Sequence, residues 1–143
     1  MNWKGLGEGR IKWNKGVPEG ISFKPYEMAY CSSINYTHEI DLLWAGMQQA
    51  ENLKFPMRQQ GNKKLNEKRI HPCHKPILLY KKLALDFDLK GKKVYCGHNG
   101  SGSDRIAFDG YVSEFVASEI DNDYWMAQEK RFYCYSSQAN MFI

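Results

Sequence analysis

The fold of this chain is decided by residues 93–132, KVYCGHNGSGSDRIAFDGYVSEFVASEIDNDYWMAQEKRF. This stretch opens with a short apolar strand pattern that ends in the glycine loop GSGS, residues 100–103. A short helix pattern follows the loop, Gly110 ends it, and a second strand pattern runs up to Glu119. A strand, a glycine loop, a helix and another strand in this order predict a βαβ unit and an α/β fold.

The glycine loop also predicts a place where a cofactor can approach the backbone closely. Glycines have no Cβ, so backbone N–H groups can reach a bound group. Ser103 and Asp104 are good N-caps for the helix that follows. Glu119 follows the loop by about 20 residues, where a Rossmann-type fold places a ribose-binding carboxylate. A glycine loop alone is weak evidence, and an ordinary turn is the alternative interpretation.

Helices are predicted on both sides of this unit. Pro76 suits the first turn of one helix, and Asp121 or Asn122 is an acceptable start for the final one. Beyond Phe132 the periodicity is too weak to read. The first helix is predicted to bury Ile77, Leu78, Leu79, Leu83, Ala84, Leu85 and Phe87, and to expose Lys81, Lys82, Asp86 and Asp88. The final helix carries Tyr124, Ala127, Gln128 and Arg131 at helical spacing. Core or half-buried positions are expected for Tyr80, Trp125 and Tyr133.

The N-terminal third predicts three short strands. Arg10 to Trp13 alternates polar and apolar residues, and a second candidate is centred on Met28 to Cys31. The third candidate runs from Glu39 to Trp44, with Gly46 ending it. We therefore expect residues 1–47 to form sheet.

Three short elements together resemble a known family. The run HPCHKP, residues 71–76, resembles the H-P-T-Q-K-P element of DNA adenine-N6 and cytosine-N4 methyltransferases whose cofactor half follows the catalytic half. Residues 94–103 resemble their S-adenosylmethionine loop, D-x-x-x-G-S-G-S. The EID run at residues 119–121, with the helix after it, resembles their next strand-to-helix element. The likeness covers roughly Lys63 to Phe132.

This resemblance implies a shortened Rossmann-like methyltransferase sheet with flanking helices, lacking the catalytic strand. It further implies a single domain over residues 1–143, in which 1–47 form sheet, 48–70 form a polar basic loop and 71–143 form the cofactor-side half. The cofactor-binding residues that it implies are Lys75, Pro76, Gly100, Ser101, Gly102, Ser103 and Glu119.

The sequence departs from the family at two places. The family's acceptor motif, D-P-P-Y, N-P-P-Y or S-P-P-Y, holds the amino group of a flipped base, and no Pro-Pro occurs in this chain. About ten residues precede the first strand, too few for a strand and that turn, so no catalytic residue is predicted. Where the family has Asp at the end of the strand, this chain has Cys96. A neutral thiol cannot neutralise the cofactor's ammonium, so S-adenosylmethionine is expected to bind only weakly.

The charge is unevenly distributed. From Lys54 to Lys75 the chain has seven Lys or Arg residues and one acidic residue, Glu67. The segment is either a solvated loop or a patch that contacts phosphates. The candidate nucleic-acid or partner-binding residues are Lys54, Arg58, Lys63, Lys64, Lys68 and Arg69.

Composition limits the class of protein. With 143 residues, of which 43% are hydrophobic and 14% aromatic, the chain can form a packed globule. No apolar run is long enough to span a membrane, and the first residues lack a hydrophobic signal core, so we expect a cytoplasmic protein with no membrane partner. The scattered cysteines are expected to be reduced thiols. Zinc at His71, Cys73, His74, Cys96 and His98 is the alternative, but no zinc signature spacing occurs and no metal is predicted.

Two functions from different classes follow as hypotheses. The first is a degenerate methyltransferase-like protein that is inactive alone, either a remnant or one half of a split S-adenosylmethionine-dependent DNA methyltransferase. The second is a repurposed non-enzymatic binding protein, such as a phage-type inhibitor or decoy of a nucleic-acid-handling defence complex. Loss of a central strand leaves open sheet edges, so a protein partner or a self-dimer is expected, with DNA or RNA contact as a further prediction.

Overall fold

The computed structural model describes residues 7–16, 24–42 and 70–140. The contacts divide the chain into two compact units, residues 1–45 and residues 46–143, and each is described by itself. The predicted single domain stays a prediction, and nearly all of its polar basic loop lies outside the described residues.

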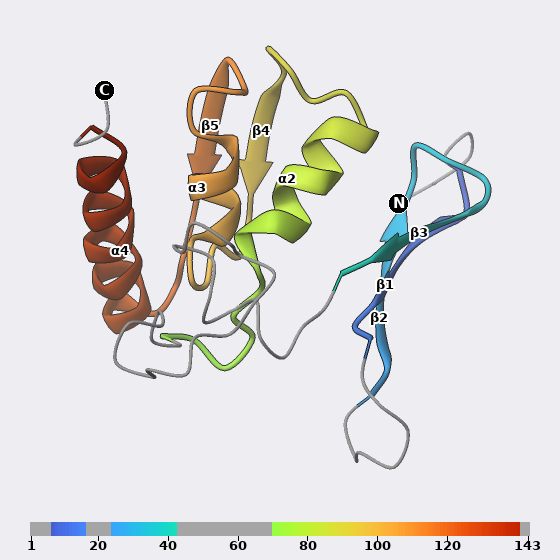
Figure 1. Cartoon of the computed structure of the whole chain (residues 1–143), viewed down its shortest axis with the longest axis horizontal. Helices are drawn as coiled ribbons and strands as arrows, with labels where there is room; N and C mark the ends of the chain where they lie inside the picture. Colours follow the sequence, from blue (N-terminus) through green and yellow to red (C-terminus); the bar gives the residue numbers. More distant parts are fainter. Residues whose placement is uncertain (1–6, 17–23, 43–69, 141–143) are drawn as a thin grey trace. The chain divides into compact units, whose positions relative to one another are not determined.

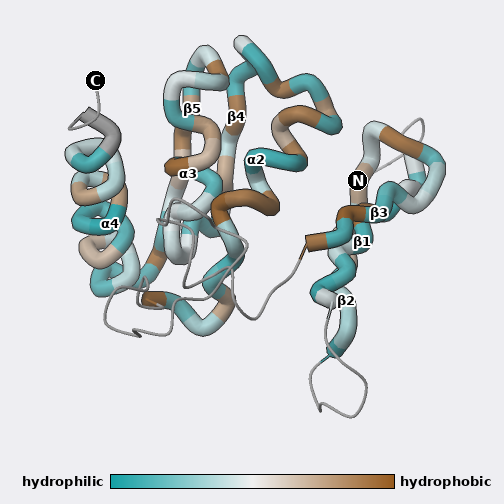
Figure 2. The backbone as a smooth tube through the Cα atoms, viewed as in Figure 1, coloured by the Kyte–Doolittle hydropathy of each residue, from teal (hydrophilic) through white to brown (hydrophobic). Residues whose placement is uncertain are grey.

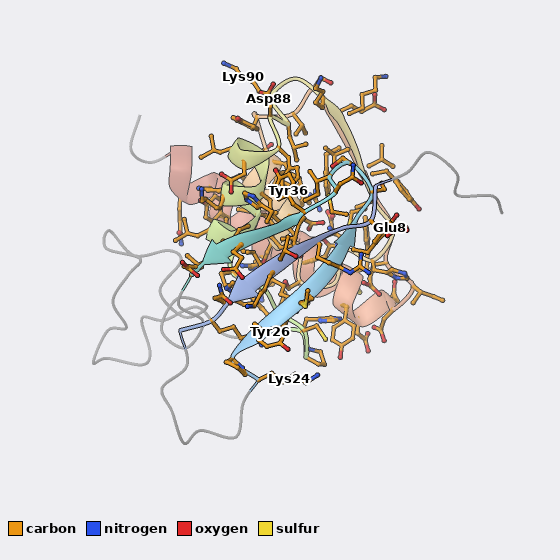
Figure 3. The ribbon with its side chains drawn as sticks, turned by 90° about the vertical axis from the view of Figure 1, so that its right-hand side faces the viewer. Glu8, Lys24, Tyr26, Tyr36, Asp88 and Lys90 are labelled. Atoms are coloured by element: carbon orange, nitrogen blue, oxygen red, sulfur yellow. The ribbon has the colours of Figure 1, made fainter. Side chains whose placement is uncertain are left out.

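The N-terminal unit contains a three-stranded sheet of β1 (Gly9–Asn14), β2 (Tyr26–Cys31) and β3 (Thr37–Asp41). The strand order is β2-β1-β3, with β2 antiparallel and β3 parallel to β1 (Figure 3). Strict alternation places Trp13 and Ile40 on one face as a buried pair in register. The indole N–H of Trp13 donates to the Leu42 carbonyl at 2.9 Å, which ties the ends of β1 and β3 together.

The C-terminal unit contains the predicted βαβ arrangement. The helix α2 (Ile77–Asp86) leads to β4 (Lys93–Cys96), α3 (Ser103–Phe108), β5 (Glu114–Ala117) and α4 (Asn122–Asn140). The strands β4 and β5 are parallel, and α3 connects them (Figure 1). The predicted strand, loop, helix and strand are therefore confirmed in type and order.

The core of this unit lies where α2 and α3 pack on the sheet. Ile77 and Ala84 of α2 meet the buried residues of α3, and Val94 and Phe115 approach from the two strands. The ring of Phe108 lies edge-on to Tyr80 and to Phe115. Figure 2 shows apolar colour along α2 and α3, whereas α4 is mostly hydrophilic.

Some expected positions are wrong. Leu85 is 65% exposed because it lies next to Ala84 on the helix, about 100° away from the buried stripe. Tyr133 is 73% exposed, and its neighbour Phe132 is one of the α4 residues that pack against the core. Ser103 does not cap α3, because Gly102 holds the N-cap position. The strand β5 ends at Ala117, two residues before Glu119.

The final helix begins where the sequence predicts and runs further than periodicity indicated. The carboxylate of Asp121 accepts the backbone N–H groups of Asp123 and Tyr124 at 2.9 and 3.1 Å, which is an N-cap. The helix continues to Asn140 although its last turns carry no clear apolar stripe.

The mixed α/β class with flanking helices is confirmed. The predicted single shortened sheet is not what the described strands form, because they pair as two small sheets of three and two strands. Within the described ranges, no helix combines the length and the apolar character needed to cross a membrane.

Candidate functional site

The glycine loop after β4 adopts a conformation that favours glycine at two positions. The φ angles of Gly100 and Gly102 are 55° and 72°, in the left-handed region. A Cβ on Gly102 would lie 2.7 Å from Oε1 of Gln128, so α4 also requires the absence of a side chain there. The N–H of Gly102 donates to the Asn99 carbonyl at 2.9 Å and closes the turn.

The carboxylate of Glu119 lies against this loop. Its Oε2 accepts the backbone N–H of Gly100 at 2.8 Å, and its Oε1 accepts the N–H of Asp121 at 3.0 Å. These two N–H groups, Asp121 first, lower the pKa of Glu119. Glu119 is therefore an ionised acceptor beside the glycine loop.

The start of α2 contacts the same loop. The hydroxyl of Ser103 donates to the Lys75 carbonyl at 2.6 Å, and Pro76 is fully buried at the N-cap of α2. The ring of His71 approaches to 3.5 Å from where a Cβ of Gly100 would stand, and it lies edge-on to Tyr124 with centroids 4.4 Å apart. Two segments separated by the whole of α2 and β4 thus meet at one place.

The last helix, α4, also contacts the glycine loop. Nη1 of Arg131 donates to the Ser101 carbonyl and to the hydroxyl of Ser103, both at 2.8 Å. Gln128 is 1% exposed, and neither atom of its amide has a hydrogen-bond partner in the described structure. Helical spacing had placed these two residues on one side of α4. That spacing could not show that this side faces the loop.

The Cys96 thiol at the end of β4 lies beside the Asp104 carboxyl of α3. Burial, together with the nearby Asp104, raises the pKa of Cys96 to about 11. Burial raises the pKa of Asp104 itself, while Nδ2 of Asn99 donates to its Oδ1 at 2.7 Å. Cys96 is therefore neutral at physiological pH. The sequence had suggested only a capping role for Asp104, so its contact with Cys96 is a feature that sequence reasoning missed.

The predicted residues fall into two groups. All the candidate cofactor residues lie at this site: Lys75, Pro76, Gly100, Ser101, Gly102, Ser103 and Glu119. Those predicted to contact a nucleic acid or a partner lie outside the described residues: Lys54, Arg58, Lys63, Lys64, Lys68 and Arg69.

The predicted site residues include no metal ligand. In residues 7–16, 24–42 and 70–140, no three His, Cys, Asp or Glu side chains gather closely enough to hold an ion. Of the five residues considered as zinc ligands, His71, Cys73, His74, Cys96 and His98, the structure leaves Cys73 and His98 exposed.

Comparison with known proteins adds no identification. No protein-family model matches the chain, and no curated protein matches it. The interpretation of the site therefore depends on its own chemistry. Backbone N–H groups, left-handed glycines and an ionised carboxylate can bind a polyhydroxylated ligand.

Proposed function

We propose that this chain is a DNA amino-methyltransferase-like protein that binds the nucleoside part of S-adenosylmethionine weakly and does not methylate DNA alone. The observation that carries this proposal is the contact of the Glu119 carboxylate with the N–H of Gly100. It brings the acidic residue that follows β5 against the glycine loop, near where a Rossmann-like fold holds its ribose-binding carboxylate.

The chemistry of Glu119 suits a ribose. Ribose hydroxyls are donors, and a carboxylate has about four lone-pair sites, of which the two N–H groups occupy one on each oxygen. Its lowered pKa keeps the acceptor ionised. The bare Cα atoms of Gly100 and Gly102 leave the backbone accessible on the loop.

The end of β4 does not suit the other end of the cofactor. A neutral Cys96 cannot balance an ammonium, and loss of one charged hydrogen bond weakens binding by about 1.5 to 3 kcal/mol, roughly tenfold to a hundredfold. Asp104 already accepts from Asn99 and from the N–H of Arg105. We therefore expect affinity for adenosine and for S-adenosylmethionine to be similar.

Methyl transfer needs an acceptor site that this sequence does not contain. The D/N/S-P-P-Y motif is absent from residues 1–143. We propose that the chain is either a remnant or one half of a split enzyme, and in the second case another chain supplies the acceptor motif and completes the flipped-base pocket.

Calorimetry with S-adenosylmethionine and adenosine tests this proposal. Wild type should bind both, and Glu119→Gln should weaken both at least tenfold. Glu114→Gln is the matched control, because Glu114 lies on β5 in an exposed pair with Lys93 and away from the loop. No binding by wild type at millimolar ligand would overturn the nucleoside site. DNA methylation by the purified chain would overturn the inactivity.

A second proposal belongs to another class. The basic segment Lys54 to Lys75 favours a non-enzymatic binder of a nucleic-acid-handling complex, such as a phage-type inhibitor or decoy. Capture of a nuclease or helicase complex by tagged protein, lost in K63E/K64E and retained in K90E/K92E, would support it. Lys90 and Lys92 are exposed lysines outside the basic segment, so this control changes the same amount of charge elsewhere.

A further inference from the structure

The strand β2 is an edge of the N-terminal sheet, and its outer side pairs with no described strand (Figure 3). The N–H of Lys15 donates to the Pro25 carbonyl at 2.8 Å, which identifies Lys15 and Pro25 as a hydrogen-bonded pair of the β1–β2 ladder. Backbone groups alternate in direction along an antiparallel strand. The N–H and C=O groups of Tyr26, Met28 and Tyr30 therefore point to the open edge.

The same three residues carry exposed side chains. Tyr26, Met28 and Tyr30 are 43%, 51% and 55% exposed and form one row, because alternate residues share a face. Arg10 lies 5.3 Å from the Tyr30 ring centroid, and Lys12 lies 5.1 Å from that of Tyr26. Both cations belong to β1, so charge borders the row on the side that faces β1.

The charges distinguish β2 from the other edge of the sheet. The only charged residue of β2 is Glu27, which forms a 2.6 Å ion pair with Lys15. The other edge strand, β3, has Glu39 and Asp41 on one face. Antiparallel self-pairing of β3 about Glu39 would place two carboxylates opposite each other, which is unfavourable. Self-pairing of β2 brings together no like charges.

We propose that two copies of this chain pair antiparallel through β2, about a two-fold axis at Met28. This interface is independent of the nucleoside site proposed above. Met28 then faces Met28 of the partner copy, and each Tyr26 faces Tyr30 of the partner copy. All three residues exchange hydrogen bonds across the edge, and the tyrosines form cross-strand aromatic pairs. If one copy slid along the other to the next allowed register, one of Tyr26, Met28 and Tyr30 would lose its pair of backbone hydrogen bonds to β2 of the partner copy. The register centred on Met28 therefore has the most hydrogen bonds between the two β2 strands.

Oligomeric state at graded concentrations provides the first test. Sedimentation velocity should show a monomer–dimer equilibrium for wild type and a monomer for Met28→Lys, which opposes two lysines across the axis. Thr37→Lys is the matched control on exposed β3, and it should associate as wild type does. Circular dichroism establishes that each variant is folded. A wild-type monomer at every concentration, or equal loss of dimer in both variants, would overturn the proposal.

Disulfide capture tests the register. In a hydrogen-bonded antiparallel pair the Cα atoms lie about 5.5 Å apart, within the range a disulfide bridges. Met28→Cys, in a background with Cys31, Cys73 and Cys134 replaced by Ser, should form a covalent dimer under mild oxidation. Ala29→Cys in the same background should not, because Ala29 faces Glu27 of the partner copy. Cross-linking at Ala29 and not at Met28 would refute this register, and a dimer built from a different surface would cross-link at neither.

Discussion

The Cys96 thiol at the end of β4 has a pKa well above that of an ordinary cysteine. The sequence predicts a neutral group at this position, and burial beside Asp104 raises its pKa from 9.0 to about 11. A neutral thiol leaves the loop without the negative charge that an ammonium would need. The same shift in pKa also has a consequence for stability.

The folded state keeps the Cys96 proton to higher pH than the unfolded chain does. Stability should therefore be fully present below pH 9 and fall as pH rises toward about 11, since only the unfolded state releases this proton in that window. Urea titrations across this range should show a shallower decline for Cys96→Ser than for wild type. Cys134→Ser, which removes an exposed thiol on α4, should keep the wild-type slope. Equal slopes for wild type and Cys96→Ser would contradict the assignment.

At the scale of elements, the loop and α4 are fitted to each other. Arg131 donates to Ser101 and Ser103, and the amide of Gln128 packs on Gly102. The helix α4 is mostly hydrophilic, so these few contacts carry much of its attachment to the loop. Glycine is required at position 102 both for its φ angle and for this packing.

Alanine substitutions at Gly102 and Gly110 measure the φ requirement and the packing requirement separately. Gly102 and Gly110 both have positive φ, 72° and 69°, but a Cβ on Gly110 would meet no atom within 4 Å. Gly110→Ala should lower the free energy of unfolding by about 1 kcal/mol through backbone strain alone. Gly102→Ala should cost about 1 to 3 kcal/mol more, because Gln128 must move. Denaturant unfolding measures both, and adding Gln128→Ala should recover part of the extra loss. An equal loss of unfolding free energy in the two variants would show that the packing of α4 on Gly102 does not restrict this position.

At the scale of the whole molecule, the two units have separate sheets. The core of the C-terminal unit centres on Phe108, and the buried pair of the N-terminal sheet is Trp13 with Ile40. Compact units of this kind commonly open as separate cooperative segments.

Amide exchange in core variants tests this separation. Phe108→Ala should destabilise the C-terminal unit by about 3 to 5 kcal/mol and speed exchange in β4, α3 and β5. The amides of β1 and β3 should keep their wild-type rates. Trp13→Ala is the reciprocal variant and should affect the N-terminal sheet alone. Parallel loss of protection in both units from either variant would show one cooperative structure.

Much of the local structure could be predicted, because its causes are short-range. Left-handed turns need glycine, as at Gly102, and a helix needs a cap, as at Asp121. The alternation in Arg10 to Trp13 and the βαβ order of residues 93–132 likewise depend on neighbouring residues. The predicted burial of Leu85 and Tyr133 was wrong, because the side of each helix that faces the core depends on distant residues.

The sequence by itself therefore determined the order and type of the elements and the position of the glycine loop. Only the tertiary structure decided that the described strands pair as two sheets, that Arg131 and Gln128 face the loop, and that Asp104 sits beside Cys96. The physical reason is the distance along the chain over which each kind of interaction acts. Turn and cap preferences act within a few residues, whereas strand pairing, burial and the pKa of a buried group depend on residues brought together from distant parts of the chain.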